Sequence, residues 1–172
     1  MPEDGSECID FKMGNWVVSV RSASPKWRFK ETSALIRKVI RCATLYLNLE
    51  DYGRGTSVDF LLTEDDDIRR LNKIYRDNDK PTNVLSFEGV FSNESFGEIP
   101  QLLGSIALSI DTIEREAEEQ KKTLNNHIAH LILHGVLHLL GYDHEKNSDA
   151  DIMERTETNV LHSFGIADPY RA

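Results

Sequence analysis

The sequence predicts a single domain in which a mixed β-sheet of about four strands is covered by about five helices. Strand-like and helix-like segments alternate along the chain, which favours one mixed sheet over separate units. The length of 172 residues suits one hydrophobic core that buries about 70% of the unfolded chain's surface. No internal repeat, low-complexity tract or long linker divides the chain. We therefore expect one domain over residues 16–172, preceded by a polar leader over residues 1–15.

Short β-rich segments supply the predicted strands. Val58, Phe60 and Leu62 recur at every second position, which is the spacing of a half-buried strand. Loops are expected at residues 77–83 and 89–100, where glycine, proline and polar residues gather. The expected strands are residues 16–20, 58–62, 84–87 and 105–110.

The remaining segments have helical periodicity or helix-terminal signals. Thr63 precedes a run of acidic residues, so its hydroxyl is the predicted N-cap of the helix that follows. Ser148 is predicted to cap another helix. Gly141 and Gly165 follow helical segments and can take the left-handed conformation that ends a helix. The expected helices are residues 32–47, 64–75, a charged segment from 111, 126–140 and 148–164.

Composition and charge limit the classes of function. No apolar run reaches the roughly 20 residues that span a membrane, and the polar start is not a secretory signal. Cys8 and Cys42 lie in unrelated contexts, so we expect no disulfide framework and a cytoplasmic location. The net charge of −9 works against nucleic-acid binding by the whole surface. It leaves room for one local basic segment, formed by Arg69, Arg70, Lys73, Arg76 and Lys80.

The histidine spacing predicts a metal site. His134 and His138 are four residues apart on a predicted helix, so both imidazoles lie on one face with Cβ atoms about 5–6 Å apart. Gly141 ends the helix, and the chain then turns back and can bring His144 to the same point. Three neutral nitrogens leave the fourth tetrahedral position open, which is typical of a catalytic rather than a structural zinc.

The alternative is a set of buried histidines that hydrogen-bond within the core. A lone histidine in so apolar a helix would have that role. Here two histidines precede the helix-ending glycine and one follows it, and each of the three would need its own buried hydrogen-bond partner. Metal ligands are therefore favoured. His130 lies one turn before the ligands and is interpreted as a supporting group or a core residue. His127 and His162 are expected at the surface or at helix ends.

The spacing H-x-x-x-H-x-x-G-x-x-H matches metzincin proteases with one difference. Those proteases have Glu directly after the first histidine as general base, and this chain has Gly135 there. A peptidase of that mechanism would lack the group that takes a proton from water. Phosphodiester cleavage depends more on a metal and on cations, and the planar fork of an arginine matches a phosphate.

Two long motifs resemble the YbeY family of bacterial endoribonucleases. The first, H-G-x-L-H-L-x-G-Y-D-H, stands without a break at residues 134–144. The second, Y-R-x-x-D-K-P-T-N-V-L-S-F, stands at residues 75–87. The resemblance extends over residues 16–170. The chain departs from the family pattern at Glu88, where proline is frequent, and at Ser105, where aspartate is frequent.

The resemblance implies a zincin-like α+β fold and cleavage of single-stranded RNA, with roles in small-subunit ribosomal RNA maturation and ribosome quality control. It implies one Zn²⁺ per chain, bound by His134, His138 and His144, and a catalytic role for Arg76. Ribosomal or ribosome-assembly proteins are the expected protein partners. No small-molecule cofactor and no membrane contact are expected.

Other interpretations of the same residues stay open. Lys73, Lys80 and Asn83 are candidates to bind the RNA backbone, or they belong to a structural loop. Tyr142 and Asp143 lie beside the ligands, and they either act in catalysis or only shape the turn. The metal site also fits a metallopeptidase, which the glycine after the first histidine disfavours. A third interpretation is a non-catalytic ribosome-assembly factor whose metal ties the last helix to the core.

Overall fold

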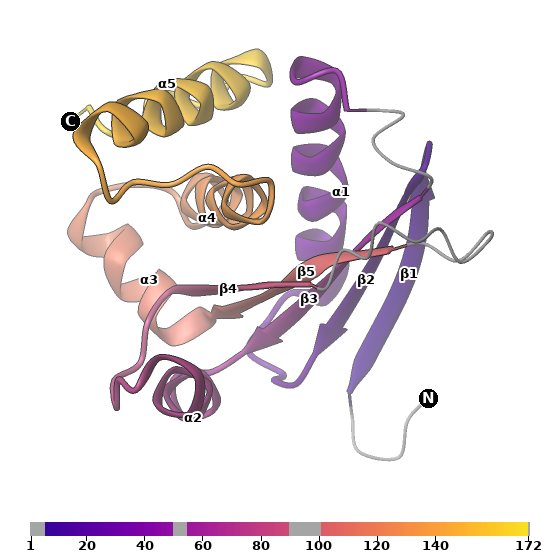
Figure 1. Ribbon diagram of the computed structural model, residues 1–172. Helices are drawn as coiled ribbons and strands as arrows, with labels where there is room; N and C mark the ends of the chain where they lie inside the picture. Colours follow the sequence, from indigo (N-terminus) through magenta and orange to yellow (C-terminus); the bar gives the residue numbers. More distant parts are fainter. Residues whose placement is uncertain (1–5, 50–54, 90–100, 172) are drawn as a thin grey trace.

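The computed structural model describes residues 6–49, 55–89 and 101–171. These residues form five strands and five helices in the order β1, β2, α1, β3, α2, β4, β5, α3, α4, α5 (Figure 1). The strands build one mixed sheet with the order β1-β2-β3-β5-β4. The prediction of a single α+β domain is confirmed, with five strands in place of about four.

Parallel pairing runs through the middle of the sheet. Strand β3 (Thr56–Thr63) lies between β2 (Trp16–Ser22) and β5 (Gln101–Ser109) and is parallel to both. The outer strands are antiparallel to their neighbours, since β1 (Glu7–Met13) pairs with β2 and β4 (Val84–Glu88) pairs with β5. Strand β4 thus lies at one end of the sheet, where helix α4 contacts it.

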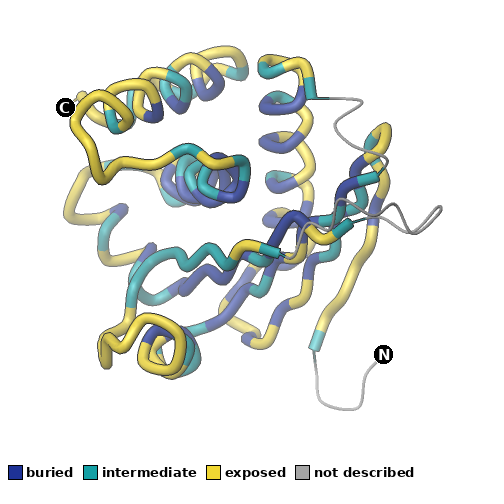
Figure 2. Tube along the Cα trace, in the orientation of Figure 1, coloured by how far each residue is buried: buried dark blue, intermediate teal, exposed yellow. Residues whose placement is uncertain are grey.

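Helix α4 is the centre of the helical layer. It contacts α1, α3 and α5 as well as strands β4 and β5, and it is buried along most of its length (Figure 2). Helix α2 lies on the opposite side of the sheet from α1, α4 and α5 (Figure 1). No helix in the described ranges is both long and apolar enough to cross a membrane. The helices are α1 (Phe29–Tyr46), α2 (Asp65–Arg76), α3 (Ile110–Glu119), α4 (Leu124–Leu139) and α5 (Asn147–Ser163).

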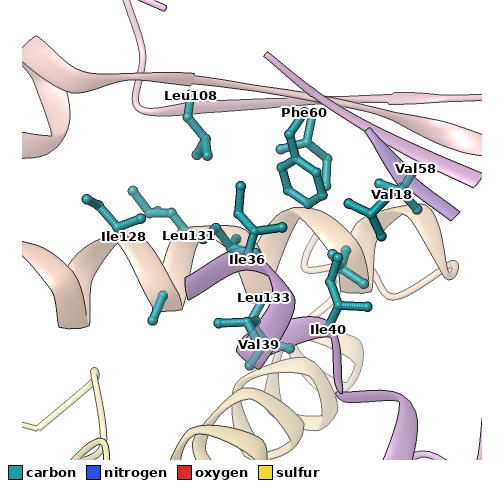
Figure 3. Packing of buried hydrophobic residues seen from close by; sticks show 14 of the residues in the cluster. Val18, Ile36, Val39, Ile40, Val58, Phe60, Leu108, Ile128, Leu131 and Leu133 are labelled. Carbon is teal, nitrogen blue, oxygen red and sulfur yellow. The ribbon is translucent and has the colours of Figure 1, made fainter. Parts of the chain in front are cut away.

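The hydrophobic core fills the space between the sheet and helices α1 and α4. Phe60 of β3 and Leu108 of β5 point from the sheet toward Ile36 of α1, and Leu133 of α4 completes this group (Figure 3). Each of the four side chains is at most 2% exposed. Burying a side chain of this kind contributes about 1.5–3 kcal/mol, so this layer is the main source of fold stability.

Two glycines allow α4 to approach the sheet closely. A Cβ on Gly104 of β5 would lie 2.5 Å from Cδ2 of Leu139, which is closer than atoms can pack. A Cβ on Gly135 of α4 would lie 3.1 Å from two carbons of Ile106 and 3.2 Å from Oγ of Ser86. A larger residue at either position would push the helix and the sheet apart.

Strand β1 falls inside residues 1–15, for which the sequence analysis predicts only a polar leader. Phe11 is the one buried residue of this strand, so the pattern carries almost no hydrophobic signal. The strand exists because its backbone pairs with β2 along seven residue pairs. Strand β5 also starts earlier than expected, at Gln101. The expected connection at 89–100 lies outside the described residues except for Gly89.

Two predicted helix caps are wrong. Thr63 is the last residue of β3, and Glu64 occupies the N-cap position of α2 with an extended backbone. The hydroxyl of Thr63 donates instead to Oδ2 of Asp67 at 3.1 Å. In the same way, Lys146 rather than Ser148 precedes the first residue of α5. Neither observed N-cap side chain accepts a hydrogen bond from the helix, so packing rather than capping sets these two helix starts.

Asp65 ties the start of α2 to β5 and α3. Its Oδ1 accepts hydrogen bonds from Ser109 at 2.7 Å and Thr112 at 2.6 Å, and its Oδ2 accepts one from Arg115 at 3.0 Å. Burial opposes ionisation of this carboxyl, but the hydrogen bonds from the three donors outweigh burial and lower the pKa of Asp65 below its ordinary value. Asp65 therefore stabilises the fold while its carboxyl is ionised.

We expect Asp65→Asn to lower the free energy of unfolding by about 1.5–3 kcal/mol at neutral pH. Because the folded pKa lies below the unfolded value of about 3.9, this contribution is present above that value and is lost as the pH falls through the folded pKa. Urea unfolding of both proteins at neutral and acidic pH measures the difference. Asp66→Asn, at an exposed position in the same helical turn, is the matched control. A difference that persists in acid would contradict the ionic origin.

Candidate metal centre

Three histidine rings meet at the end of α4. The Nε2 atoms of His134 and His138 are 3.0 Å apart. The ring centroid of His144 lies 5.7 Å from that of His134 and 4.9 Å from that of His138. One nitrogen of each ring lies within 4.8 Å of the other two. Nitrogens around a tetrahedral metal ion are roughly 3.3 Å apart when the metal–nitrogen distance is about 2.0–2.1 Å. The donor set therefore fits one metal ion, and the structure brings the three predicted ligands together.

A helix-ending turn positions His144. Gly141 has a φ of 97°, and the N–H groups of Gly141 and Tyr142 donate to carbonyls of the last helical turn, both at 3.0 Å. These two bonds form a Schellman motif, which confirms that Gly141 ends the helix. Oδ1 of Asp143 then accepts a hydrogen bond from the backbone N–H of His144 at 2.7 Å. Asp143 thus shapes the turn that carries the third histidine.

A buried carboxylate on α5 orients the first histidine. Glu157 is fully buried, and its Oε1 lies 2.5 Å from Nδ1 of His134. Its Oε2 lies 2.9 Å from Nε2 of His130 and also accepts a hydrogen bond from the hydroxyl of Tyr170. Burial opposes ionisation, but hydrogen bonds from His130 and His134 outweigh it and lower the pKa of Glu157 to about 2. An ionised carboxylate only accepts, so Nδ1 of His134 carries the proton and Nε2 presents its lone pair to the other rings.

His130, His134 and Glu157 form a second group whose ligand atoms lie within 4.8 Å of one another. Glu157 lies at hydrogen-bond distance from each of the two histidines, and neither His130 nor Glu157 lines the cleft described below. We therefore assign this group to hydrogen bonding. His130 has the supporting position that the sequence predicts, and Tyr170 joins the C-terminal segment to the same carboxylate.

The histidine triad lines a cleft of about 1220 Å³. The cleft is bordered by the end of α2, strands β4 and β5, the end of α4 and the turn that follows it. Arg76, the last residue of α2, lines the same cleft, and its Nη2 donates to the carbonyl of Ser86 at 2.8 Å. No carboxylate in the described ranges lies within ion-pair distance of Arg76. Arg76 and the three imidazole rings thus line one cleft, together with the carboxylates of Glu88, Asp143 and Glu145.

Three other residues of the basic segment form ion pairs with aspartates. Arg69 and Lys73 both pair with Asp79, at 2.8 Å and 3.6 Å, and Arg70 pairs with Asp67 at 3.3 Å. Lys73 and Lys80 do not line the cleft, so the structure separates these two candidates from the metal centre.

Asn83 does line the cleft, but its side chain is occupied. The Nδ2 group donates to both oxygens of Glu116, at 3.1 Å and 3.0 Å, and Oδ1 accepts from the backbone N–H of Val84 at 2.6 Å. These bonds support the interpretation of Asn83 as a residue that holds the start of β4.

The remaining histidines lie away from the triad. His127, for which the sequence predicts a surface or helix-end position, lies in the first turn of α4 but is only 3% exposed. Its Nε2 is 2.7 Å from Oε2 of Glu116, and burial lowers the pKa of His127 despite this carboxylate. His162 is exposed in the last turn of α5, as predicted.

Sequence reasoning missed Glu157, although a signal was present. Glu157 shares one face of α5 with Met153, Val160 and Leu161, all of which are buried. A carboxylate on the apolar face of an amphipathic helix is rarely buried unless it has a partner. That placement alone indicates a buried polar contact, but it does not identify His134 as the partner.

Comparisons with known proteins agree on one family. The family model described as endoribonuclease YbeY matches residues 18–165. A curated endoribonuclease YbeY of Bradyrhizobium diazoefficiens is 43% identical over 145 residues, which cover 83% of this chain and 78% of the relative. A second, from Rhodopseudomonas palustris strain HaA2, is 40% identical over 154 residues, which cover 86% of this chain and 78% of the relative.

A solved structure supports the fold. The solution structure of TM1509 from Thermotoga maritima matches with a TM-score of 0.53 and 22% sequence identity. The match covers 90% of this chain and 99% of that chain. At this level of identity the likeness shows the arrangement of the strands and helices alone.

We expect His138→Ala to lose the bound metal and His130→Ala to keep it, because only His138 belongs to the triad that faces the cleft. Elemental analysis of proteins purified without chelator measures the metal content per chain. Equal loss in both variants would mean that the ligands are the second group, which includes His130.

We expect Glu157→Gln to weaken metal binding by about 10–100-fold, because a neutral amide no longer fixes the protonated nitrogen of His134. Competition with a chromophoric chelator gives the affinity, and the absorption of a Co²⁺-substituted sample reports the ligand geometry. Tyr170→Phe removes one hydrogen bond to the same carboxylate and should give a smaller loss. Unchanged affinity in both well-folded variants would show that the carboxylate only supports the core.

Proposed function

The chain belongs to the YbeY endoribonuclease family, and on this basis we propose that it is a zinc-dependent endoribonuclease that cleaves single-stranded RNA. The observation that carries the proposal is the cleft in which the histidine triad and Arg76 face the same space. In metal-dependent phosphodiester hydrolysis, a metal ion with an open coordination position and a nearby cation both stabilise the charge that builds on the phosphate. Here the two lie on separate elements, α4 and α2, across one cleft.

The residues of the chain have separate proposed roles. His134, His138 and His144 hold the zinc ion, which when bound supplies a Lewis acid next to the substrate phosphate. Burial and the neighbouring rings lower the pKa of His138, which favours the neutral form that a ligand must have. Arg76 donates hydrogen bonds to the phosphate through the N–H groups that its bond to Ser86 leaves free.

The surroundings of Gly135 support a phosphodiester rather than a peptide as substrate. Ile106 and Ser86 lie close to Gly135, so the general base of a metzincin protease could be added here only if these side chains or α4 shifted. The hydroxyl of Ser86 also donates to the carbonyl of Gly135 at 3.3 Å. The helix and the strand are thus held together at the position where a peptidase has its glutamate.

Family membership supports a more specific biological role. We propose ribosomal RNA of the small subunit as the substrate, ribosome quality control as the process, and ribosomal or ribosome-assembly proteins as partners in the cytoplasm. The catalytic domain is proposed to cover residues 16–172, with strand β1 as an addition to its edge. No part of this role involves a membrane or a small-molecule cofactor.

One assay separates the proposed enzyme from its rivals. Purified, metal-loaded protein is incubated with an unstructured RNA and with an unfolded protein as alternative substrates. Cleavage of the RNA alone supports the proposal, and cleavage of the polypeptide supports a metallopeptidase. If both the RNA and the polypeptide stay uncleaved, the non-catalytic ribosome-assembly factor becomes the better interpretation.

We expect Arg76→Lys to fold, keep its metal and lose about 10²–10³-fold in the rate of RNA cleavage. Lysine keeps the charge but lacks the planar fork that matches two phosphate oxygens. Cleavage rate, metal content and melting temperature are measured on the same preparation. The control is Arg70→Lys, since Arg70 is an exposed arginine of the same helix that pairs with Asp67 away from the cleft. Near-normal cleavage by Arg76→Lys would remove Arg76 from the site.

A further inference from the structure

An aromatic pair, exposed Tyr75 and half-buried Phe87, lines the cleft next to Arg76. Tyr75 precedes Arg76 in the last turn of α2, and Phe87 lies on β4. Their ring centroids are 5.2 Å apart at an interplanar angle of 62°. The guanidinium carbon of Arg76 lies 5.7 Å from the Phe87 ring centroid. Both rings border the same cleft as the histidine triad.

The contact with Phe87 covers only a minor part of the surface of Tyr75. Tyr75 is 63% exposed, although an aromatic ring that supports a core is normally buried. No hydrogen-bond partner of the Tyr75 hydroxyl is found among residues 6–49, 55–89 and 101–171. The edge contact holds the ring beside the cleft, while much of its surface stays open to whatever enters there.

We propose that Tyr75, supported by Phe87, is a stacking site for one unpaired base of the RNA whose phosphate Arg76 holds. The inference rests on the proposed ribonuclease function and adds a recognition element to it. Bases stack on aromatic side chains, and each such contact strengthens single-strand binding by about tenfold or more. The site selects for an unpaired base because a base inside a duplex is already stacked on its neighbours. The phosphate and the base are thus read by consecutive residues of one helix.

The test measures binding by the metal-loaded full chain before cleavage proceeds. A short single-stranded RNA carries the fluorescent base 2-aminopurine, and rapid mixing records the fluorescence change on binding. Wild-type protein should change the fluorescence on stacking, and Tyr75→Phe should behave like it. Tyr75→Leu keeps the apolar bulk without a flat π face, so it should lose the signal and bind about tenfold more weakly. Ile74→Ala, at the neighbouring exposed position outside the cleft, is the matched control.

An abasic nucleotide in the same RNA distinguishes stacking from a structural role of Tyr75. If the base stacks on the ring, the abasic RNA binds more weakly to wild type, and Tyr75→Leu adds no further loss. The inference would be overturned if the affinity losses from the abasic nucleotide and from Tyr75→Leu were additive. It would also be overturned if Tyr75→Leu showed normal fluorescence and affinity. Cleavage by wild type is followed in parallel. Normal wild-type cleavage with no effect of Tyr75→Leu refutes only the stacking site, whereas wild type that neither binds nor cleaves RNA refutes the proposed function as well.

Discussion

The close contact of α4 with strands β4 and β5 is the constraint on which the site depends. Gly135 and Gly104 remove the side chains that would hold the helix away from the sheet. The end of α4 can therefore lie beside β4, and its two histidines open into the cleft that β4 and β5 border. The same contact brings Ser86 near both Gly135 and Arg76, so one residue of β4 hydrogen-bonds to both α4 and α2. Packing of α4 on the sheet thus places two of the three histidines, and the turn that begins at Gly141 places the third.

Arg76 lines the cleft of the histidine triad without an ion pair among the described residues, although the protein is acidic. Arg70 pairs with Asp67, whereas Arg69 and Lys73 share Asp79, so two aspartates offset part of the charge of these three cations. Arg76 has a carbonyl partner, which orients the guanidinium without cancelling its charge. The field near the cleft depends on individual side chains, which include Glu88, Asp143 and Glu145 as well as Arg76, and not on the net charge of −9 alone.

Local features of the fold and site could be predicted from the sequence, whereas pairings between distant segments could not. The spacing of His134 and His138 and the stop at Gly141 depend on helix geometry alone, and the structure has both. Strand β1 depends on backbone pairing with β2, which leaves no hydrophobic pattern in a mostly exposed segment. The bond between Glu157 and His134 joins residues 23 positions apart, and the neutralisation of Lys73 depends on where Asp79 lies after the loop turns. Such contacts follow from tertiary packing, which single-segment patterns do not encode.

The hydrogen bond from Tyr170 to Glu157 has a consequence for the order in which the protein acquires its site during synthesis. The chain leaves the ribosome from its N-terminal side, so α4 with His134 and His138 is available well before residue 170. The carboxylate that orients His134 gains its tyrosine partner only when the segment after α5 docks. Until α5 docks, His134 lacks the carboxylate that orients it, whereas Tyr170 adds a hydrogen bond to the other oxygen of that carboxylate. Alignment of His134 is thus coupled to the docking of α5, and the segment after α5 then completes the hydrogen bonding of Glu157.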